Sequence, residues 1–228
     1  ILLDKFEQAF TFSKSIWTEN EFFFEIDLLL GLESFIKKDY SNAEKYFKRL
    51  NNAHRSEFLL EGFLGDFLLA WIRAAENNKS ESLKFFDKIP THYSNLKKIQ
   101  NIFLQCYFDT PGTQENFEKL TSSEDFIFSR YNFFLVNYLL YKNKNKEAEK
   151  ITKLSRKKHD SNLLIKQTEN FILTKKNKKI KDFFNCKNPN DVIAEVFYII
   201  ANLYSTENDY QLSNFYLKIS FFLNSKFT

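Results

Sequence analysis

Small and bulky side chains recur at fixed intervals along this chain. Gly31 is followed twelve residues later by Ala43, and an aromatic residue, Phe47, comes four residues after Ala43. The same intervals fit five further segments, so six units share one pattern. The residues at the first position of these units are Gly31, Ala70, Leu104, Val136, Thr168 and Ala201. Because these anchors are 32 to 39 residues apart, the chain is predicted to consist of repeated supersecondary units.

The pattern predicts pairs of antiparallel α-helices. A small residue on each of two facing helices lets the backbones approach closely, and an aromatic ring four residues later fills the space beside the crossing. A capping box at Ser41 and Glu44 is predicted to open the second helix of the first unit. Asn116 and Ile180 stand where four of the units have a small residue, so looser packing is expected in the third and fifth units.

The start of the chain is predicted to belong to an incomplete unit. Ala9 lies 34 residues before Ala43, so residues 1–18 are expected to form the second helix of a repeat whose first helix is missing. The chain begins at Ile1 rather than Met, and we expect that its natural N-terminus has been removed, with any targeting segment. Residues 1–228 as a whole are predicted to form a single domain.

These residues resemble the tetratricopeptide repeat, a helix hairpin of 34 residues. The resemblance rests on Leu30-Gly31, Ala43 and Phe47 in the first unit and on Ala201, Tyr204 and Ser213 in the last. Residues 191–227 are also similar to the ends of uncharacterised tetratricopeptide proteins of alphaproteobacteria. The resemblance covers nearly the whole chain and implies a right-handed α-solenoid of about six repeats after a partial one. An irregular helical bundle with accidental spacing is the alternative.

Composition agrees with long helices joined by short turns. The 228 residues include only four glycines and three prolines, whereas all-β folds need many turn residues. Hydrophobic residues make up 43% and charged residues 27%, which is ordinary for a globular protein. The preference for Phe, Lys, Asn, Ile and Tyr is typical of an AT-rich genome. The 28 phenylalanines are therefore not interpreted as base-stacking platforms.

The resemblance implies that the first helix of each repeat lines a concave groove that binds another protein or a peptide. In the early units the implied groove positions are apolar, and we interpret Leu32, Phe67 and Trp71 as internal packing. In the later units these positions carry polar and aromatic residues, which suit the amides and carboxylates of an extended peptide. Solvation without a ligand is the alternative for them. The predicted groove residues are Lys98, Asn101, Gln105, Arg130, Phe133, Asn137, Tyr141, Glu169, Tyr198 and Asn202.

Positive charge is concentrated in one part of the chain. Residues 142–181 contain 14 Lys or Arg and four Asp or Glu, although the whole chain has a net charge of only +4. Two of the turns within this segment are expected to lie on the same edge of the solenoid, where they would form a basic ridge. The alternative function is therefore an adaptor for nucleic acid or an acidic surface, and a merely solvated edge is the simpler explanation. The ridge residues are Lys142, Lys144, Lys146, Lys175, Lys176, Lys178 and Lys179.

No catalytic or metal-binding motif is found in the sequence. The three histidines, His54, His92 and His159, have no Cys, Asp, Glu or His at a recurring metal-ligand spacing, and we interpret them as solvated linker residues. No GxGxxG, GxxxxGK[ST], HExxH or GxSxG pattern occurs. We therefore expect no metal, no cofactor and no enzymatic activity. An enzyme accessory or hydrolase domain, with a carboxylate pair assembled only by folding, is the third hypothesis.

The two cysteines leave the cellular compartment open. Cys106 and Cys186 are 80 residues apart, which is not a metal-site spacing and excludes a dense disulfide framework. A single bridge between them is possible, so both the cytoplasm and the periplasm stay open. No run of 18 apolar residues occurs, and no membrane-spanning segment is expected. The oligomeric state is not predicted.

Overall fold

The computed structural model of the chain describes residues 5–51, 61–122 and 129–226. Within these residues it contains thirteen α-helices, one 3-10 helix at Thr91–Tyr93 and no β-strand, which confirms the all-α class. The α-helices are α1 Phe6–Ile16, α2 Phe24–Ile36, α3 Tyr40–Leu50, α4 Glu61–Ala75, α5 Lys79–Lys88, α6 Ser94–Tyr107, α7 Thr113–Ser122, α8 Ser129–Tyr141, α9 Asn145–Lys158, α10 Leu163–Leu173, α11 Asn177–Phe183, α12 Pro189–Thr206 and α13 Tyr210–Leu223.

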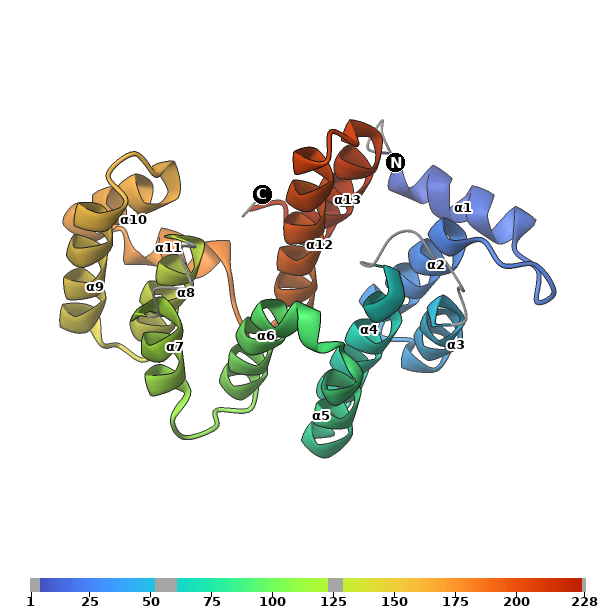
Figure 1. Cartoon of the computed structure of the whole chain (residues 1–228), viewed down its shortest axis with the longest axis horizontal. Coiled ribbons are helices and arrows are strands. Elements are labelled where there is room, and N and C mark those ends of the chain that lie inside the picture. The colour runs from blue at the N-terminus through green and yellow to red at the C-terminus, as the bar shows by residue number, and fades with distance from the viewer. Residues whose placement is uncertain (1–4, 52–60, 123–128, 227–228) are drawn as a thin grey trace. The chain divides into compact units, whose positions relative to one another are not determined.

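From α2 onward these helices form six consecutive pairs, α2–α3, α4–α5, α6–α7, α8–α9, α10–α11 and α12–α13 (Figure 1). The two helices of a pair pack on each other in α2–α3, α4–α5, α8–α9 and α10–α11. The chain is therefore consistent with a helical repeat. The handedness of a solenoid and the number of repeats stay predictions.

Each of the six pairs is joined by a turn with the same backbone geometry. The second residue after the first helix has a positive φ, which is uncommon for a residue other than glycine. The N–H of the next residue donates to the carbonyl five residues earlier, for example Asp39 to Ser34 at 2.9 Å and Lys144 to Leu139 at 2.8 Å. This is the Schellman arrangement that ends a helix. The positive-φ residues are Lys38, Asn77, Asp109, Asn143, Lys175 and Asn208, with φ between 51° and 63°.

The turn of the third pair is two residues longer than the other five. It contains residues 108–112, including Gly112 with a φ of 81°, whereas the others contain three residues. In those five pairs the anchor lies seven residues before the positive-φ residue, as Gly31 does before Lys38. The corresponding residue before Asp109 is Ile102, two residues before the anchor predicted at Leu104. The fixed interval of twelve placed this anchor too late because the turn is longer.

The small-residue rule has a direct structural cause in the first pair. A Cβ added to Gly31 would lie 2.2 Å from Cε1 of Phe47, which is far inside contact distance. Ala43 and Phe47 are fully buried. Gly31 therefore allows the Phe47 ring to pack directly against the backbone of α2.

The N-terminal cap of α3 differs from the prediction. Helix α3 begins at Tyr40, and Asp39 caps it by accepting a hydrogen bond from the N–H of Asn42 at 3.2 Å. The capping box predicted at Ser41 and Glu44 is therefore wrong. Helices α5 and α13 are capped in the same way, by Asn78 and Asp209. In these three pairs the capping residue directly follows the positive-φ residue, so one short motif ends the first helix and begins the second.

The chain divides into two compact units, which we describe separately. The first contains residues 1–97 and 193–226, as far as they are described. In it the first and last helices touch, because the ring of Phe222 in α13 stacks on Phe6 of α1 at 4.1 Å and lies 5.7 Å from Phe10. A linear solenoid has contacts only between neighbouring repeats. The α1–α13 contact departs from that arrangement, and the prediction of a single domain stays a prediction.

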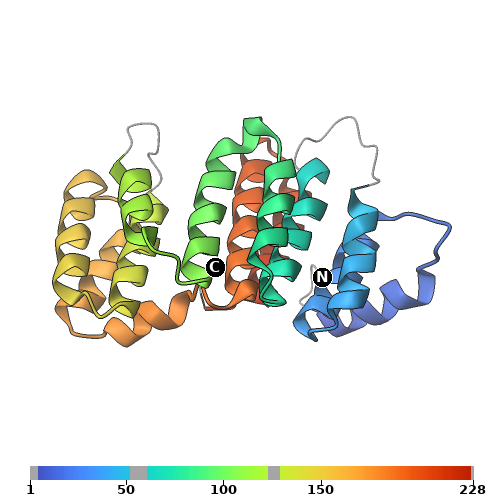
Figure 2. The same cartoon turned by 90° about the horizontal axis from the view of Figure 1, so that it is seen from below.

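The second unit contains residues 98–192, with helices α7 to α11 packed beside one another (Figure 2). Its interior is a cluster of phenylalanines from α6, α8 and the segment after α11. The Phe103 ring lies 4.9 Å from Phe134 and 5.0 Å from Phe184, and the rings of Phe134 and Phe184 are 4.6 Å apart. Because all three side chains are buried, they determine which side of α6 and of α8 faces the interior, and therefore which side faces outward.

Candidate partner-binding pocket

An open pocket of about 420 Å³ lies between helices α6 and α7. Helix α6 is amphipathic, since Ile99 and Phe103 are fully buried on one side. The residues on its other side follow helical spacing, at intervals of three, one and three. Helix α7 contributes three residues at the same kind of spacing. The lining residues are Lys98, Asn101, Ile102 and Gln105 of α6 and Asn116, Lys119 and Leu120 of α7.

The lining combines amides with an apolar surface. Asn116 Nδ2 donates to Gln105 Oε1 at 2.8 Å and connects the two helices. Ile102 and Leu120 are buried and supply the apolar part. Oδ1 of Asn101 is shielded from solvent and accepts no hydrogen bond from the described residues. An unpaired buried acceptor costs about 1–3 kcal/mol, and a ligand donor that reaches it after a small rotation of the amide would remove that cost.

The electrostatic character of the pocket is positive. Lys98 and Lys119 are both exposed, one on each helix, and no carboxylate is among the described residues that line the pocket. Ammonium groups form short, strong hydrogen bonds with carboxylates and phosphates. The pocket therefore suits an anionic group flanked by amide hydrogen-bonding groups.

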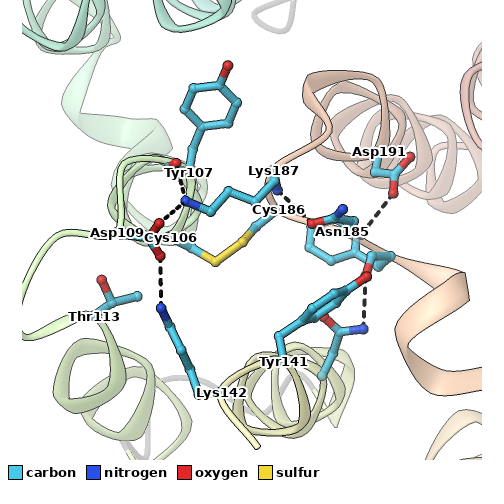
Figure 3. Close-up of a disulfide and its surroundings, with 12 residues drawn as sticks. Cys106, Tyr107, Asp109, Thr113, Tyr141, Lys142, Asn185, Cys186, Lys187 and Asp191 are labelled. Carbon is cyan, nitrogen blue, oxygen red and sulfur yellow. Dashed lines mark hydrogen bonds and ion pairs between the residues drawn. A yellow bond between two sulfur atoms is a disulfide. The ribbon is translucent and has the colours of Figure 1, made fainter. Parts of the chain in front are cut away.

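A disulfide lies directly behind this pocket. Cys106 follows Gln105 in α6 and is bonded to Cys186, with a Cα–Cα distance of 6.0 Å (Figure 3). Both cysteines are buried, at 5% and 7% exposure. The bond joins the C-terminal end of α6 to the segment between α11 and α12. The bridge that the sequence left open is therefore present, and it fixes the helix that carries four of the lining residues.

Ion pairs reinforce the same junction. Lys187 Nζ donates to the carbonyl of Tyr107 at 2.7 Å and also pairs with Asp109 (Figure 3). Lys142 Nζ pairs with the other carboxylate oxygen of Asp109 at 2.8 Å. The hydrogen bonds from Lys142 and Lys187 hold the pKa of Asp109 below its usual value. The stability that these pairs contribute is therefore fully present above the ordinary pKa of an aspartate, and it is lost as the pH falls through the lowered pKa of Asp109.

Three of the ten predicted groove residues line the pocket together, namely Lys98, Asn101 and Gln105. Asn116, Lys119 and Leu120 were missed because the groove pattern counts only first helices, whereas this pocket lies between the two helices of one pair. Ile102 lies on the first helix but is not at a counted groove position. Asn116 gave a usable signal, since it is too large for a tight helix crossing. The position where loose packing was expected is thus where the pocket opens.

The predicted groove residues of α8 have structural roles. Asn137 is 3% exposed, and its Nδ2 donates to the carbonyls of Ile180 at 2.8 Å and Phe184 at 2.9 Å. Tyr141 Oη donates to the carbonyl of Lys181 at 2.7 Å, and Phe133 is fully buried. Asn137 and Tyr141 thus hold α11 against α8. The packing of α11 on α8 is a contact that the repeat spacing does not contain, and a groove role for these residues stays a prediction.

Replacing Asn137 by alanine is expected to lower the free energy of unfolding by about 2–3 kcal/mol, because two buried backbone carbonyls lose their donor. Urea denaturation followed by circular dichroism measures this change. Asn202→Ala serves as the control, since Asn202 is exposed and its amide donates to the carbonyl of Tyr198 in its own helix. The control is expected to change stability by less than about 0.5 kcal/mol. Equal effects of the two substitutions would contradict the role given to Asn137.

The remaining predicted groove residues are not among the residues that line the pocket. The Arg130 guanidinium lies over the Phe134 ring at 5.9 Å. Glu169 accepts a hydrogen bond from Arg156 Nε at 2.9 Å. Tyr198 and Asn202 belong to the other compact unit. The structure thus gathers only the α6 members of the predicted set.

The two turns of the predicted basic ridge do lie next to each other. Asn177 Nδ2 donates to Asn145 Oδ1 at 3.3 Å, which joins the α10–α11 turn to the α8–α9 turn. Lys142 is paired with Asp109, and Lys144 donates to Gln114 at 2.6 Å. Lys179 lies over the ring of Phe171 at 5.6 Å. The other ridge residues are exposed to solvent, namely Lys146, Lys175, Lys176 and Lys178.

No family model, curated protein sequence or solved structure matches this chain. Among the described residues, His, Cys, Asp and Glu side chains form no group of three that could hold a metal ion. No described helix is both long enough and apolar enough to cross a membrane. Of the three histidines, His159 follows α9 and partial burial lowers its pKa, whereas His54 and the side chain of His92 lie outside the described residues.

Proposed function

We propose that this chain is a helical-repeat protein of the tetratricopeptide type that binds another protein, without catalysing a reaction. We further propose that the pocket between α6 and α7 holds a carboxylate of an extended peptide segment. The observation that carries this proposal is the lining itself, in which the described residues supply two lysines and three amides around an apolar surface but no acidic side chain. The resemblance of the anchor residues to tetratricopeptide repeats supports a peptide rather than a small molecule.

Each part of the lining has a complement in such a peptide. Lys98 and Lys119 approach the pocket from opposite helices and neutralise a carboxylate from two sides. The amides of Asn101 and Gln105 match the backbone groups of an extended chain, which has unused donors and acceptors. Ile102 and Leu120 provide contact for an apolar side chain. Among the described residues, the lining contains no His, Cys, Asp or Glu, and this supports a binding role.

Selection from a random peptide library is expected to enrich sequences with acidic residues or a required C-terminal carboxylate. Charge reversal at both lysines, Lys98→Glu with Lys119→Glu, is expected to weaken binding of a selected peptide at least about a hundredfold, because two charge-assisted hydrogen bonds become repulsive. Fluorescence anisotropy with a labelled peptide measures the Kd of each protein.

The matched control reverses two exposed lysines outside the pocket, Lys5→Glu with Lys226→Glu. It changes the net charge by the same amount, and its Kd is expected to stay within about threefold of the original value, because exposed charges that do not line the pocket are largely screened by salt. An unchanged Kd in the Lys98→Glu and Lys119→Glu protein, or equal weakening in the control, would exclude this pocket as the binding site.

A further inference from the structure

The outward face of α9 is made of lysines. Four of them occur at intervals of four, three and four residues, which places them on one side of the helix. The opposite side carries Ala148, Thr152 and Ser155, all of which are buried. The orientation of α9 is therefore set by its packing, and the lysines point to solvent. We call this surface the α9 lysine face, and it consists of Lys146, Lys150, Lys153 and Lys157.

Little of this charge is neutralised within the chain. Lys153 pairs with Glu149 at 2.6 Å. Lys146, Lys150 and Lys157 form no ion pair with a described residue. The hydrogen bond between Asn177 and Asn145 places the α10–α11 turn beside the start of α9. That turn adds Lys175 and Lys176, and the start of α11 adds Lys178. The positive surface thus extends beyond one helix.

Leucines are exposed beside these lysines. Leu154 is 53% exposed and lies four residues after Lys150 and three before Lys157, so it is a direct neighbour of both on the helix surface. Leu173, at the end of α10, is 65% exposed and precedes Lys175 by two residues. Exposed leucines next to lysines are typical of helices that lie at the surface of a bilayer, where the apolar groups enter the acyl boundary.

We propose that the α9 lysine face binds the negatively charged surface of a lipid bilayer, as a peripheral contact. Clusters of four to eight basic residues on a helix bind anionic headgroups, and lysine suits this purpose because it acts as a point charge. Nucleic acid would use the charges but would leave Leu154 without a role. The buried disulfide also points to folding in an oxidising compartment.

Co-sedimentation with lipid vesicles tests the proposal. The full chain is expected to bind vesicles of phosphatidylcholine mixed with phosphatidylglycerol and to leave vesicles of phosphatidylcholine alone unbound. The triple substitution Lys146→Gln, Lys150→Gln and Lys157→Gln is expected to weaken binding on the order of a hundredfold. Raising the ionic strength from about 0.1 M to about 1 M shortens the screening length from about 10 Å to about 3 Å and is expected to release the unmodified protein.

Two further variants keep the result interpretable. The control Lys5→Gln, Lys38→Gln and Lys226→Gln removes the same charge from exposed lysines outside residues 98–192, and it is expected to bind like the unmodified chain. Leu154→Ser leaves the charge unchanged and is expected to weaken binding to vesicles. Equal losses in both triple variants, no effect of Leu154→Ser, or binding to DNA or RNA but not to anionic vesicles would each overturn the proposal.

Discussion

Arg49→Ala is expected to lower the free energy of unfolding of the unit formed by residues 1–97 and 193–226 by about 3–5 kcal/mol, because it leaves a buried carboxylate without its cation. Asp27 is fully buried in α2, and its Oδ1 accepts hydrogen bonds from Arg49 Nε and Trp17 Nε1, both at 2.9 Å. Arg49 also donates to the carbonyls of Thr18 at 3.3 Å and Glu19 at 2.8 Å. One side chain thus attaches the α1–α2 connection to α3.

The effect of this substitution is expected to depend on pH. Burial raises the pKa of Asp27, although hydrogen bonds from Trp17 and Arg49 act in the opposite direction. Without Arg49 the rise is larger, and an acid with a raised folded-state pKa loses stability as the pH increases above its unfolded value, here 3.8. The deficit of the variant should therefore be largest near pH 7 and should narrow as the pH falls towards 4.

Denaturant titrations at several pH values measure both effects. The control is Lys84→Ala, because Lys84 forms an ion pair of 2.6 Å with Glu81 but is 67% exposed. An exposed pair contributes about 0–1 kcal/mol, so the control should unfold almost like the original protein at every pH. If Arg49→Ala were no more destabilising than Lys84→Ala, the buried pair would not be a main stabilising contact.

The sequence was sufficient to predict those parts of the fold that depend on local spacing. The all-α class and the helix pairs follow from small and aromatic residues at fixed intervals, and Gly31 against Phe47 shows the contact that causes this interval. The third anchor was displaced because a turn of different length changes the interval without changing the helices. Intervals within a helix pair therefore predict the helix positions only where the turn between the two helices has a constant length.

Contacts between distant segments left no comparable signal. The packing of α11 on α8 through Asn137, and the contact of Phe222 with Phe6, join residues separated by no recurring distance. The same limit applies to the candidate site. Lys98, Asn101 and Gln105 were predicted as groove positions of the family counted from Leu104, but Lys119 was not, since its place in the pocket depends on how α7 packs against α6.

Replacement of both cysteines by serine is expected to lower the free energy of unfolding by about 4 kcal/mol. The bond closes a loop of 80 residues, and in the chain-entropy account a loop of this length restricts the unfolded state by about that amount. The unit of residues 98–192 contains both cysteines, so its unfolding should be affected most. Urea denaturation with and without a reductant measures the difference, and the unmodified protein should approach the variant once it is reduced.

The doubly substituted protein is itself the control for the reductant, because it has no disulfide to lose and should unfold at the same urea concentration in both conditions. The peptide pocket gives a second measurement. Lys187 is expected to keep its hydrogen bond to the carbonyl of Tyr107 without the disulfide, so the end of α6 keeps one attachment. The free energy of peptide binding should therefore change less than the free energy of unfolding. Two free thiols in the purified protein, or a stability that reductant leaves unchanged, would show that the bond is not a structural constraint. If the doubly substituted protein kept its free energy of unfolding but no longer bound the peptide, the role of the disulfide would instead be to maintain the geometry of the pocket alone.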